Sequence, residues 1–405
     1  LNEVQSLLTD IQALVVEAAN KGAFSDEEIA ANQMQLDNAI DSITRIANTT
    51  TFAGRKLING ELDYVTSGVT ATELADVNVM AAKFGSQPYV GVDVEVSLSA
   101  QKAELSFAQP GLSTAPVTLD IRGNDGIITL TFPASATTVE MVNAINRQVD
   151  ATGITAVASG TGGVSGMRLQ SLEYGSDAFV SIREIGTTDV FSVTDRDGMT
   201  DSRTNGRDAS AMINGIAATA DGLKLSYSST LLKLDLTLAE AFGNGSNEAG
   251  LGTASFAITE GGALFQLGPQ VNTNLQENIG VKSMQANKLG NTIVGFLSEL
   301  KTGQANSLST ENFQQASKIV QEVVTQVAVL RGRLGAFERN TLQPNIRQLQ
   351  ITTENLTASE ATIRDTDFAT ETSELTRSQI LVQAGTSILA IANAQSQNVL
   401  TLLGG

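Results

Sequence analysis

The chain has 405 residues and a formal net charge of −18, from 43 acidic and 25 basic side chains. This length is sufficient for two to four domains, and the negative charge argues against nucleic acid and anionic membranes as partners. The sequence contains no Cys, His or Trp, which excludes disulfides and thiol nucleophiles, together with most zinc sites and hydrolase triads.

The first 47 residues predict two helices, because apolar residues recur at alternating steps of three and four. Asn20-Lys21-Gly22 ends the first helix, with Gly22 suited to a left-handed cap. Ser25 and Glu28 predict a capping box at the start of the second. The short connection favours an antiparallel pair. The expected seams are Leu1, Val4, Leu8, Ile11, Val15 and Ala18, and then Ile29, Leu36, Ile40, Ile43 and Ala47.

The middle of the chain reads as short strands separated by turn residues. Asn59-Gly60 predicts a two-residue hairpin turn. Thr137 and Glu140 predict a second capping box, which begins a helix with Val142, Ile145 and Val149 on one face. We place a soft domain boundary at residues 204–208. The predicted strands are the β-type runs at residues 89–98, 128–133, 155–159, 178–185, 223–229 and 232–238.

Two stretches in the middle invite a ligand-binding interpretation, and we favour plain turns for both. Asp195-Arg196-Asp197-Gly198 with Asp201 lacks the spacing of a calcium loop. The Gly-rich run from Gly160 to Gly166 precedes a strand-like segment, whereas a phosphate loop precedes a helix.

Residues 310–363 again show helical spacing, over more than three heptads. The apolar seam then continues displaced by one residue, as Leu342, Ile346, Leu349, Leu356 and Ile363. Pro344 lies close to this displacement and predicts a kink or local break. The first part of the seam is Phe313, Ala316, Val320, Val323, Val327, Leu330, Leu334 and Phe337.

A last helix is expected after Asp367, its predicted N-cap, and residues 378–405 contain no charged side chain. A membrane span needs about 20 nearly continuous apolar residues, but the longest apolar run here is Ile388 to Ala392. A helix with apolar or small residues around most of its circumference must be covered by protein, and we expect other subunits to provide the cover. The expected assembly residues are Leu375, Leu381, Ala384, Ile388, Ile391, Val399, Leu400, Leu402 and Leu403.

The two ends of the sequence resemble the bacterial flagellin family. The matching text is LNEVQSLLTDIQALVVEAANKG and TTTFAGRKLING near the start, and ENLTASEATIRDTDFATETSELTRSQILVQAGTSILAIANAQSQNVLTLLGG at the end. GRDASAMINGIAATADGLKLSY, at residues 206–227, is similar to a hook-type motif of the same family. Family members begin with a further helix that pairs with the tail, and nothing before Leu1 corresponds to it.

The resemblance implies a structural subunit of the extracellular flagellar filament, without a cofactor or enzymatic activity. Its implied partners are further copies of itself, an export chaperone on the C-terminal helix, the type III export apparatus and hook-associated proteins. The alternatives are a hook-filament junction protein and a flagellin-like surface protein that binds glycans or a host.

Flagellins that trigger the vertebrate innate receptor carry a basic residue and then a Leu on the first helix, followed later by an acidic residue. Leu14 matches that Leu, whereas Asp10 and Gln35 stand where the resemblance predicts Arg and Glu. We therefore expect weak receptor recognition, with Leu14 as the contact.

The expected fold is multidomain α+β, with a long antiparallel helical rod formed by the two chain ends and β-rich domains inserted between them. The expected order is a rod segment with hairpin (1–60), a β-rich outer domain with one helix (61–205), a second β-rich segment with the hook-type motif (206–290), a rod helix (291–364) and a terminal assembly helix (365–405).

Overall fold

The computed structural model describes residues 1–20, 25–85, 87–112, 115–159, 166–186, 191–243, 252–272, 275–365 and 367–404. These residues form two compact units, Leu1–Leu334 and Gly335–Gly405. The first unit contains one helical core and two β-sheet cores, and the second is helical. The fold is therefore α+β. The predicted Gly22 cap and residues 160–165 of the Gly-rich run lie outside the described residues.

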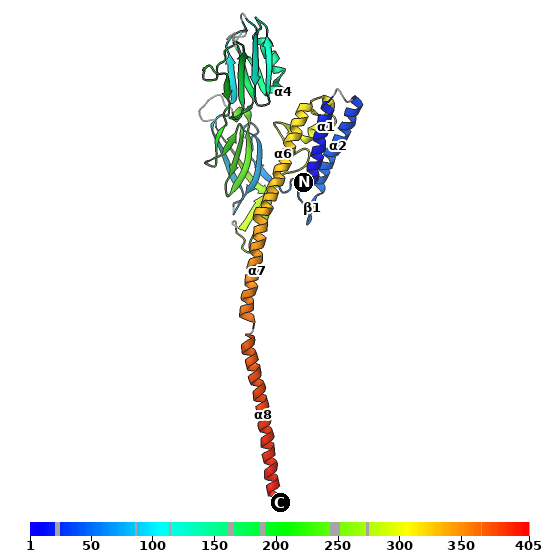
Figure 1. The fold of residues 1–405 in the computed structure, drawn as a ribbon, viewed down its shortest axis with the longest axis vertical. Coiled ribbons are helices and arrows are strands. Elements are labelled where there is room, and N and C mark those ends of the chain that lie inside the picture. The colour runs from blue at the N-terminus through cyan, green and yellow to red at the C-terminus, as the bar shows by residue number, and fades with distance from the viewer. Residues whose placement is uncertain are drawn as a thin grey trace. The chain divides into compact units, whose positions relative to one another are not determined.

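The helical core joins the beginning of the chain to a segment near its end. Helices α1 (Asn2–Ala19) and α2 (Asp26–Thr49) lie side by side (Figure 1) and share one hydrophobic core with α6 (Phe313–Phe337). The predicted capping box of α2 is confirmed, because Ser25 Oγ accepts from Glu28 N and Glu28 Oε2 accepts from Ser25 N. The buried helical residues are Val4, Leu8, Ile11, Val15 and Ala18 of α1, Leu36, Ile40, Ile43 and Ala47 of α2, and Ala316, Ile319, Val320, Val323, Val327 and Leu330 of α6.

A buried amide ties α2 to the segment that precedes α6. Gln33 is 5 % exposed, and its Nε2 donates to Leu300 O at 3.0 Å while its Oε1 accepts from Leu308 N at 2.7 Å. One side chain thus holds two short 3-10 helices, η2 (Leu297–Leu300) and η3 (Leu308–Thr310), against α2. The hairpin of β21 (Gly290–Asn291) and β22 (Gly295–Phe296) lies just before them in the chain.

The hairpin after α2 turns earlier than the sequence suggests. Strands β1 (Thr51–Phe52) and β2 (Arg55–Lys56) pair across Ala53 and Gly54, whose φ angles are +50° and +80°. The prediction of a turn at Asn59-Gly60 is wrong. Asn59 O instead accepts from Ser283 Oγ at 3.1 Å, a contact across the core that hairpin propensity does not reveal.

The inner β domain consists of two antiparallel sheets packed around one core, with strand orders β14-β13-β5-β18-β3 and β15-β16-β17-β4. Its elements are β3 (Tyr64–Ser67), β4 (Leu74–Ala82), β5 (Val90–Leu98), β13 (Ser210–Ile213), β14 (Ile216–Ala217), β15 (Thr219–Asp221), β16 (Lys224–Ser228), β17 (Leu232–Leu238), α5 (Glu240–Gly243) and β18 (Gly252–Gly261).

The outer β domain has its own core between the sheets β6-β10-β9 and β12-β11-β7-β8. The predicted capping box at Thr137 and Glu140 is confirmed. The helix is shorter than predicted, because α3 ends at Asn146 and Val149 begins a separate turn. The elements are β6 (Lys102–Phe107), β7 (Val117–Arg122), β8 (Ile127–Phe132), α3 (Thr138–Asn146), α4 (Val149–Thr152), β9 (Ile154–Ser159), β10 (Gly166–Tyr174), β11 (Phe179–Ile185) and β12 (Arg203–Asn205).

The two β domains are nested in the sequence. Strand β5 pairs with β13 and β18, and β4 pairs with β17, so residues 64–98 share a core with residues 210–258. The outer domain is an insertion into the inner one. This arrangement differs from the sequential division at residue 205 that the sequence suggests. Each of the six predicted β-type runs does overlap a strand.

The carboxylate of Asp208 links the two β domains. Asp208 Oδ1 accepts from Ser176 N at 2.9 Å and from Gly222 N at 2.8 Å, and Asp208 Oδ2 accepts from Ser176 Oγ at 2.6 Å. Burial alone would raise the pKa of Asp208, but these hydrogen bonds outweigh it and hold the pKa below its ordinary value. A Cβ at position 222 would lie 2.6 Å from Tyr174 O, so the domains approach closely only because glycine is present.

Arg333 connects the helical core to the inner β domain. Its Nη2 donates to Met80 O at 3.1 Å, at the edge of β4 where Gly280 N also donates to Met80 O, and to Gly280 O at 3.0 Å. Gly280 directly follows the hairpin of β19 (Ala263–Gln266) and β20 (Gln276–Ile279). Burial lowers the pKa of Arg333. An arginine here covers carbonyl groups that an exposed strand edge would otherwise present to water or to another chain.

The second unit contains helices α7 (Gln343–Arg364) and α8 (Phe368–Leu403). A five-residue π-turn, Glu338–Leu342, separates α7 from the end of α6 at Phe337. Pro344 occupies the first turn of α7 directly after the π-turn, and the chain stays helical from Phe313 to Arg364, so the irregularity near Pro344 is a π-turn and not the predicted break.

Gln33→Ala should lower the free energy of unfolding by about 1–3 kcal/mol, because it leaves Leu300 O and Leu308 N buried without a partner. Urea unfolding followed by circular dichroism measures the change. Gln35→Ala, an exposed position two residues along the same helix, is the matched control and should be nearly neutral. Equal effects of the two substitutions would contradict the role assigned to Gln33.

Candidate assembly surface

Helix α8 begins at a strong N-cap. Asp367 Oδ1 accepts from Ala369 N at 3.0 Å and from Thr370 N at 3.4 Å, and Asp367 Oδ2 accepts from Thr370 Oγ1 at 3.1 Å. The hydrogen bonds from Thr370 and Ala369 favour the charged carboxylate and lower the pKa of Asp367. The predicted N-cap is confirmed.

The surface of α8 is apolar around most of its circumference. Successive residues in an α-helix point about 100° apart, and the consecutive Ile380, Leu381 and Val382 are 61 %, 63 % and 67 % exposed. None of the described side chains of this 36-residue helix is buried. The predicted assembly residues are all exposed, namely Leu375, Leu381, Ala384, Ile388, Ile391, Val399, Leu400, Leu402 and Leu403.

Three further residues belong to the same surface although the sequence analysis did not select them. Ile380, Val382 and Leu389 are more than 60 % exposed. They could have been selected from the sequence because they are apolar and lie in or next to the charge-free stretch. Heptad spacing did not reveal these residues, because that spacing selects one stripe whereas this helix is apolar around most of its circumference.

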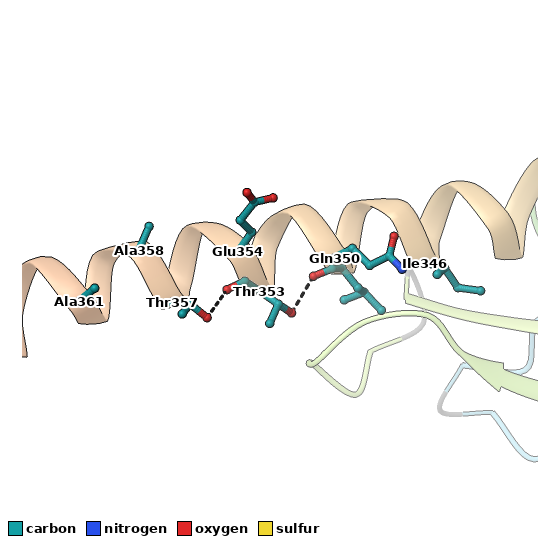
Figure 2. A pocket seen from close by; sticks show the side chains of 8 residues that line it. Ile346, Gln350, Thr353, Glu354, Thr357, Ala358 and Ala361 are labelled. Carbon is teal, nitrogen blue, oxygen red and sulfur yellow. Dashed lines mark hydrogen bonds between the residues drawn. The ribbon is translucent and has the colours of Figure 1, made fainter.

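Most of the described hydroxyl groups of the second unit have a hydrogen-bond partner within their own helix. In α7, Thr353 Oγ1 donates to Leu349 O and Thr357 Oγ1 donates to Thr353 O, at 2.8 and 2.9 Å (Figure 2). A hydroxyl that bonds the carbonyl four residues earlier presents mainly its methyl group or Cβ outward, and it can be buried without losing a partner. Other hydroxyls bonded in this way are those of Thr352, Ser359, Thr362, Thr372, Ser373, Thr376, Ser387 and Ser396.

A shallow apolar groove follows one side of α7 (Figure 2). Ile346 and Leu349 line it and are 54 % and 42 % exposed. The groove continues past Thr353 and Thr357 to Ala358 and Ala361. No residue of α7 is buried, so this helix, like α8, presents an uncovered apolar face.

The predicted rod seam is divided between the two units. Leu8, Ile11, Val15, Ile40, Ile43, Val320, Val323, Val327 and Leu330 are buried together in the helical core. Leu334 is half-buried against that core, whereas Phe337 is half-buried and belongs to the second unit. Leu14 is half-buried on α1 and packs against the same core.

Other chemistries find little support in the described ranges. Asp195 Oδ1 accepts from the backbone N of Asp197 and of Met199, as in a plain turn. No group of three or more acidic residues among the described positions is arranged to hold a metal ion. Among the described helices, none is both long enough and apolar enough to cross a bilayer.

Three family models match the sequence. The model for the bacterial flagellin N-terminal helical region matches residues 1–63, and the model for the C-terminal helical region matches residues 317–403. The flagellin hook IN motif matches residues 118–172, which span β7 to β10 of the outer domain. This match does not support the hook-type motif that the sequence analysis placed at residues 206–227, and that placement stays a prediction.

Relatives match across the same regions. The chain is 27 % identical over 442 residues to a flagellin of Salmonella typhimurium, covering 100 % of this chain and 83 % of that protein. It is 37 % identical over 151 residues to a flagellin of Bacillus subtilis, covering 35 % of this chain and 49 % of that protein. The solved structure of FliC from Burkholderia pseudomallei is similar over 84 % of this chain and 94 % of that one, at 16 % identity and a TM-score of 0.25.

Asp367→Ala should fray the first turn of α8, because the amides of Ala369 and Thr370 lose their acceptor. Amide hydrogen exchange at these two residues should become several-fold faster. Asp365→Ala, which alters a carboxylate outside the N-cap position, is the matched control and should change neither.

The same cap should respond to acid. The folded-state pKa of Asp367 lies below its ordinary value of 3.8. The stabilisation is therefore complete above the unfolded-state pKa and is lost as the pH falls through the lower folded-state value. Exchange at Ala369 and Thr370 should accelerate in that acid window in the unaltered protein but not in Asp367→Ala. An identical acid response in both would show that the carboxylate is not the cap.

Proposed function

Because the chain belongs to the bacterial flagellin family, we propose that α8 and the exposed face of α7 become buried between sister subunits on polymerisation. The protein is a structural subunit of the extracellular flagellar filament. The proposal concerns which residues form the contacts between subunits. The observation that supports it is the continuous exposure of apolar side chains along a helix without charge after Arg377.

The size of the hydrophobic term favours burial over exposure. Moving one Leu or Ile side chain from water into a packed interface contributes about 1.5–3 kcal/mol. Even a few of the apolar residues of α8 would then offset the loss of rotational and translational freedom on association. Sister subunits would bury this surface, since each subunit of a filament is surrounded by further copies of itself.

We also propose that the terminal segments form the rod of the subunit. Residues 1–60 and 291–364 contain the helices of the shared core and α7, and residues 365–405 contain α8. Phe313–Phe337, the π-turn and α7 follow one another without a non-helical gap, which supports a rod. The β domains between residues 61 and 290 would face solvent.

Further partners follow from the same surface. Before assembly, α8 would expose apolar side chains during export, and an export chaperone on this helix would prevent their aggregation. Passage through the type III export apparatus and contact with hook-associated proteins belong to the same proposal. A structural role without enzymatic activity agrees with the family to which both terminal matches point.

The alternatives have less support. A junction protein would share terminal helices, but the full-length relative is itself a flagellin. A surface-binding role would have to reside in the β domains, and no described feature of those domains favours a particular glycan or host ligand over solvent.

Receptor recognition is proposed to be weak. Leu14 packs partly against the helical core, so only part of its side chain is available, and Asp10 and Gln35 supply neither the basic nor the acidic contact that the resemblance predicts. Monomer applied to a receptor reporter cell line should give a signal well below that of a strongly stimulating flagellin. A comparable signal would contradict this proposal.

Removal of residues 378–405 from the full-length protein should abolish seeded elongation, because the interface loses most of its apolar area. Sedimentation and electron microscopy of monomer mixed with filament fragments measure elongation. Normal fibres from the shortened protein would show that α8 is not the assembly surface.

A single charge provides a sharper test. Ile388→Asp places a carboxylate in the proposed interface and should slow elongation at least tenfold, which corresponds to about 1.4 kcal/mol. The matched control is Ile127→Asp, the same substitution at a residue that is 49 % exposed on β8 of the outer domain. This variant should elongate normally. Equal rates for the two variants would overturn the assignment of α8.

A further inference from the structure

Strand β4 contains two β-bulges, and the helical core binds both of them. β4 is the edge strand of its sheet, β15-β16-β17-β4. In its pairing with β17 the register shifts twice, and the residues left out of the register are Ala75 and Met80. A β-bulge leaves one residue outside the ladder and bends the strand, which redirects its backbone groups. The carbonyls of these two residues are therefore available to a neighbouring element.

The helical core supplies one side-chain donor to each bulge. Thr292 Oγ1 donates to Ala75 O at 2.7 Å, and Arg333 Nη2 donates to Met80 O at 3.1 Å. Thr292 lies between β21 and β22, whereas Arg333 lies on α6. From position 75 to position 80 a strand advances about 17 Å. The helical core thus holds β4 at two separate points.

A cavity interrupts the packing between these two points. Its volume is about 150 Å³, which is enough for several water molecules. Asp76 and Asn78 line it from β4, and Glu322 and Gln326 line it from α6. Three acidic and three basic side chains balance around it, so it favours water over an ion of either sign. These charged residues are Asp76, Asp235, Glu322, Lys224, Lys282 and Arg333.

The two contacts differ in strength. Arg333 is half-buried and also donates to Gly280 O at 3.0 Å, while Gly280 N donates to Met80 O at 3.1 Å. Thr292 is exposed, and its bond to Ala75 is a single hydrogen bond between neutral groups. Water can replace such a bond at a small cost, whereas a charged and partly buried donor is costlier to release. The contact at Ala75 is therefore the one that opens first.

The stronger contact lies where the chain passes from the helical core into the inner β domain. Leu62 and Val281 belong to the helical core, whereas Tyr64 belongs to the core of the inner domain. Val281 N donates to Leu62 O at 2.8 Å, one residue after the Gly280 that Arg333 binds. A rotation of the domain about this crossing would displace the distant bulge at position 75 more than the bulge at position 80.

We infer that this joint is a hinge with a latch. The hinge is the chain crossing that Arg333 braces, and the latch is the hydrogen bond from Thr292 to the bulge at Ala75. Because the outer domain is inserted into the inner one, the latch fixes the orientation of both β domains relative to the helical core. Thr292 and Arg333 are positioning residues. The inference concerns the single subunit and does not depend on which surfaces become buried on assembly.

Distances between two spin labels on the full-length monomer test the latch. The chain contains no Cys, so Gln35→Cys on α2 and Glu95→Cys on β5, both exposed, provide two unique labelling sites. Double electron–electron resonance should give one narrow distance distribution for the protein with an intact latch. Thr292→Val removes the donor with little change of shape. It should increase the fraction of other distances about two- to tenfold, as expected for the loss of one hydrogen bond.

Two further substitutions are the controls for this measurement. Thr325→Val is the same change at a Thr that lines the same cavity, but Thr325 Oγ1 donates to Gln321 O of its own helix. This variant should keep the narrow distribution. Thr292→Ser retains the hydroxyl and should keep it as well.

Amide hydrogen exchange distinguishes the hinge from the latch. Arg333→Met removes the guanidinium but keeps an unbranched side chain, and exchange at Gly280 should become about tenfold faster. Arg331→Met, at an exposed position of the same helix, is the matched control and should leave this exchange unchanged. Thr292→Val should also leave it unchanged, because the hinge stays braced.

Three results would contradict the inference. The first is an unchanged distance distribution in Thr292→Val. The second is equal broadening in Thr292→Val and Thr325→Val, because the cavity lining and not the bond to Ala75 would then decide the orientation. The third is faster exchange at the buried Val323 in Thr292→Val, which would indicate general loss of structure. The proposed contacts of α7 and α8 stand or fall separately, by seeded elongation.

Discussion

The packing of α1 and α2 against α6 is the interaction on which the rest of the first unit depends. It joins residues 4–62 to residues 281–330 in one hydrophobic core, so the chain between Leu62 and Val281 must leave this core and return to it. Gln33 bonds α2 to the two 3-10 helices that precede α6. Arg333 bonds α6 to the edge of β4. The β domains can therefore vary in content without changing the helices that hold their ends, provided that the chain re-enters the core at the same place.

The same apolar spacing leads to opposite results in the two units. In α6 the seam is buried, with Val320, Val323 and Val327 fully covered. In α7 and α8 no described side chain is buried, although both helices carry apolar residues along their length. The difference is the supply of partners within the chain. Three helices of the first unit cover one another, while the second unit is left with a surface that burial against sister subunits would stabilise.

The polar groups of the second unit are compatible with such burial. Hydroxyls along α7 and α8 donate to carbonyls of their own helix, and Asp367 satisfies the first amides of α8. The charged residues stop at Arg377. An interface built on these helices would therefore bury few of these hydroxyl and amide groups without a partner.

Local features were determined by the sequence alone. The capping boxes at Ser25 and Thr137, the N-cap at Asp367 and the buried faces of α1 and α2 follow from interactions within four residues or from helical periodicity, and such interactions are encoded locally. The irregular helical turn before Pro344 has the same origin. The charge-free tail likewise marked the candidate surface, although periodicity underestimated it by selecting a single stripe.

Long-range features were decided only by the tertiary structure. The pairing of β5 with β13 and β18, which nests one β domain inside the other, depends on contacts across more than 100 residues, and alternation within a strand does not name its neighbour. Asn59-Gly60 has the composition of a hairpin turn, but Asn59 O accepts from Ser283 Oγ and the hairpin turn forms at Ala53-Gly54. The physical reason is common to both cases: local patterns state which side chains must be buried, whereas the packed chain determines what buries them.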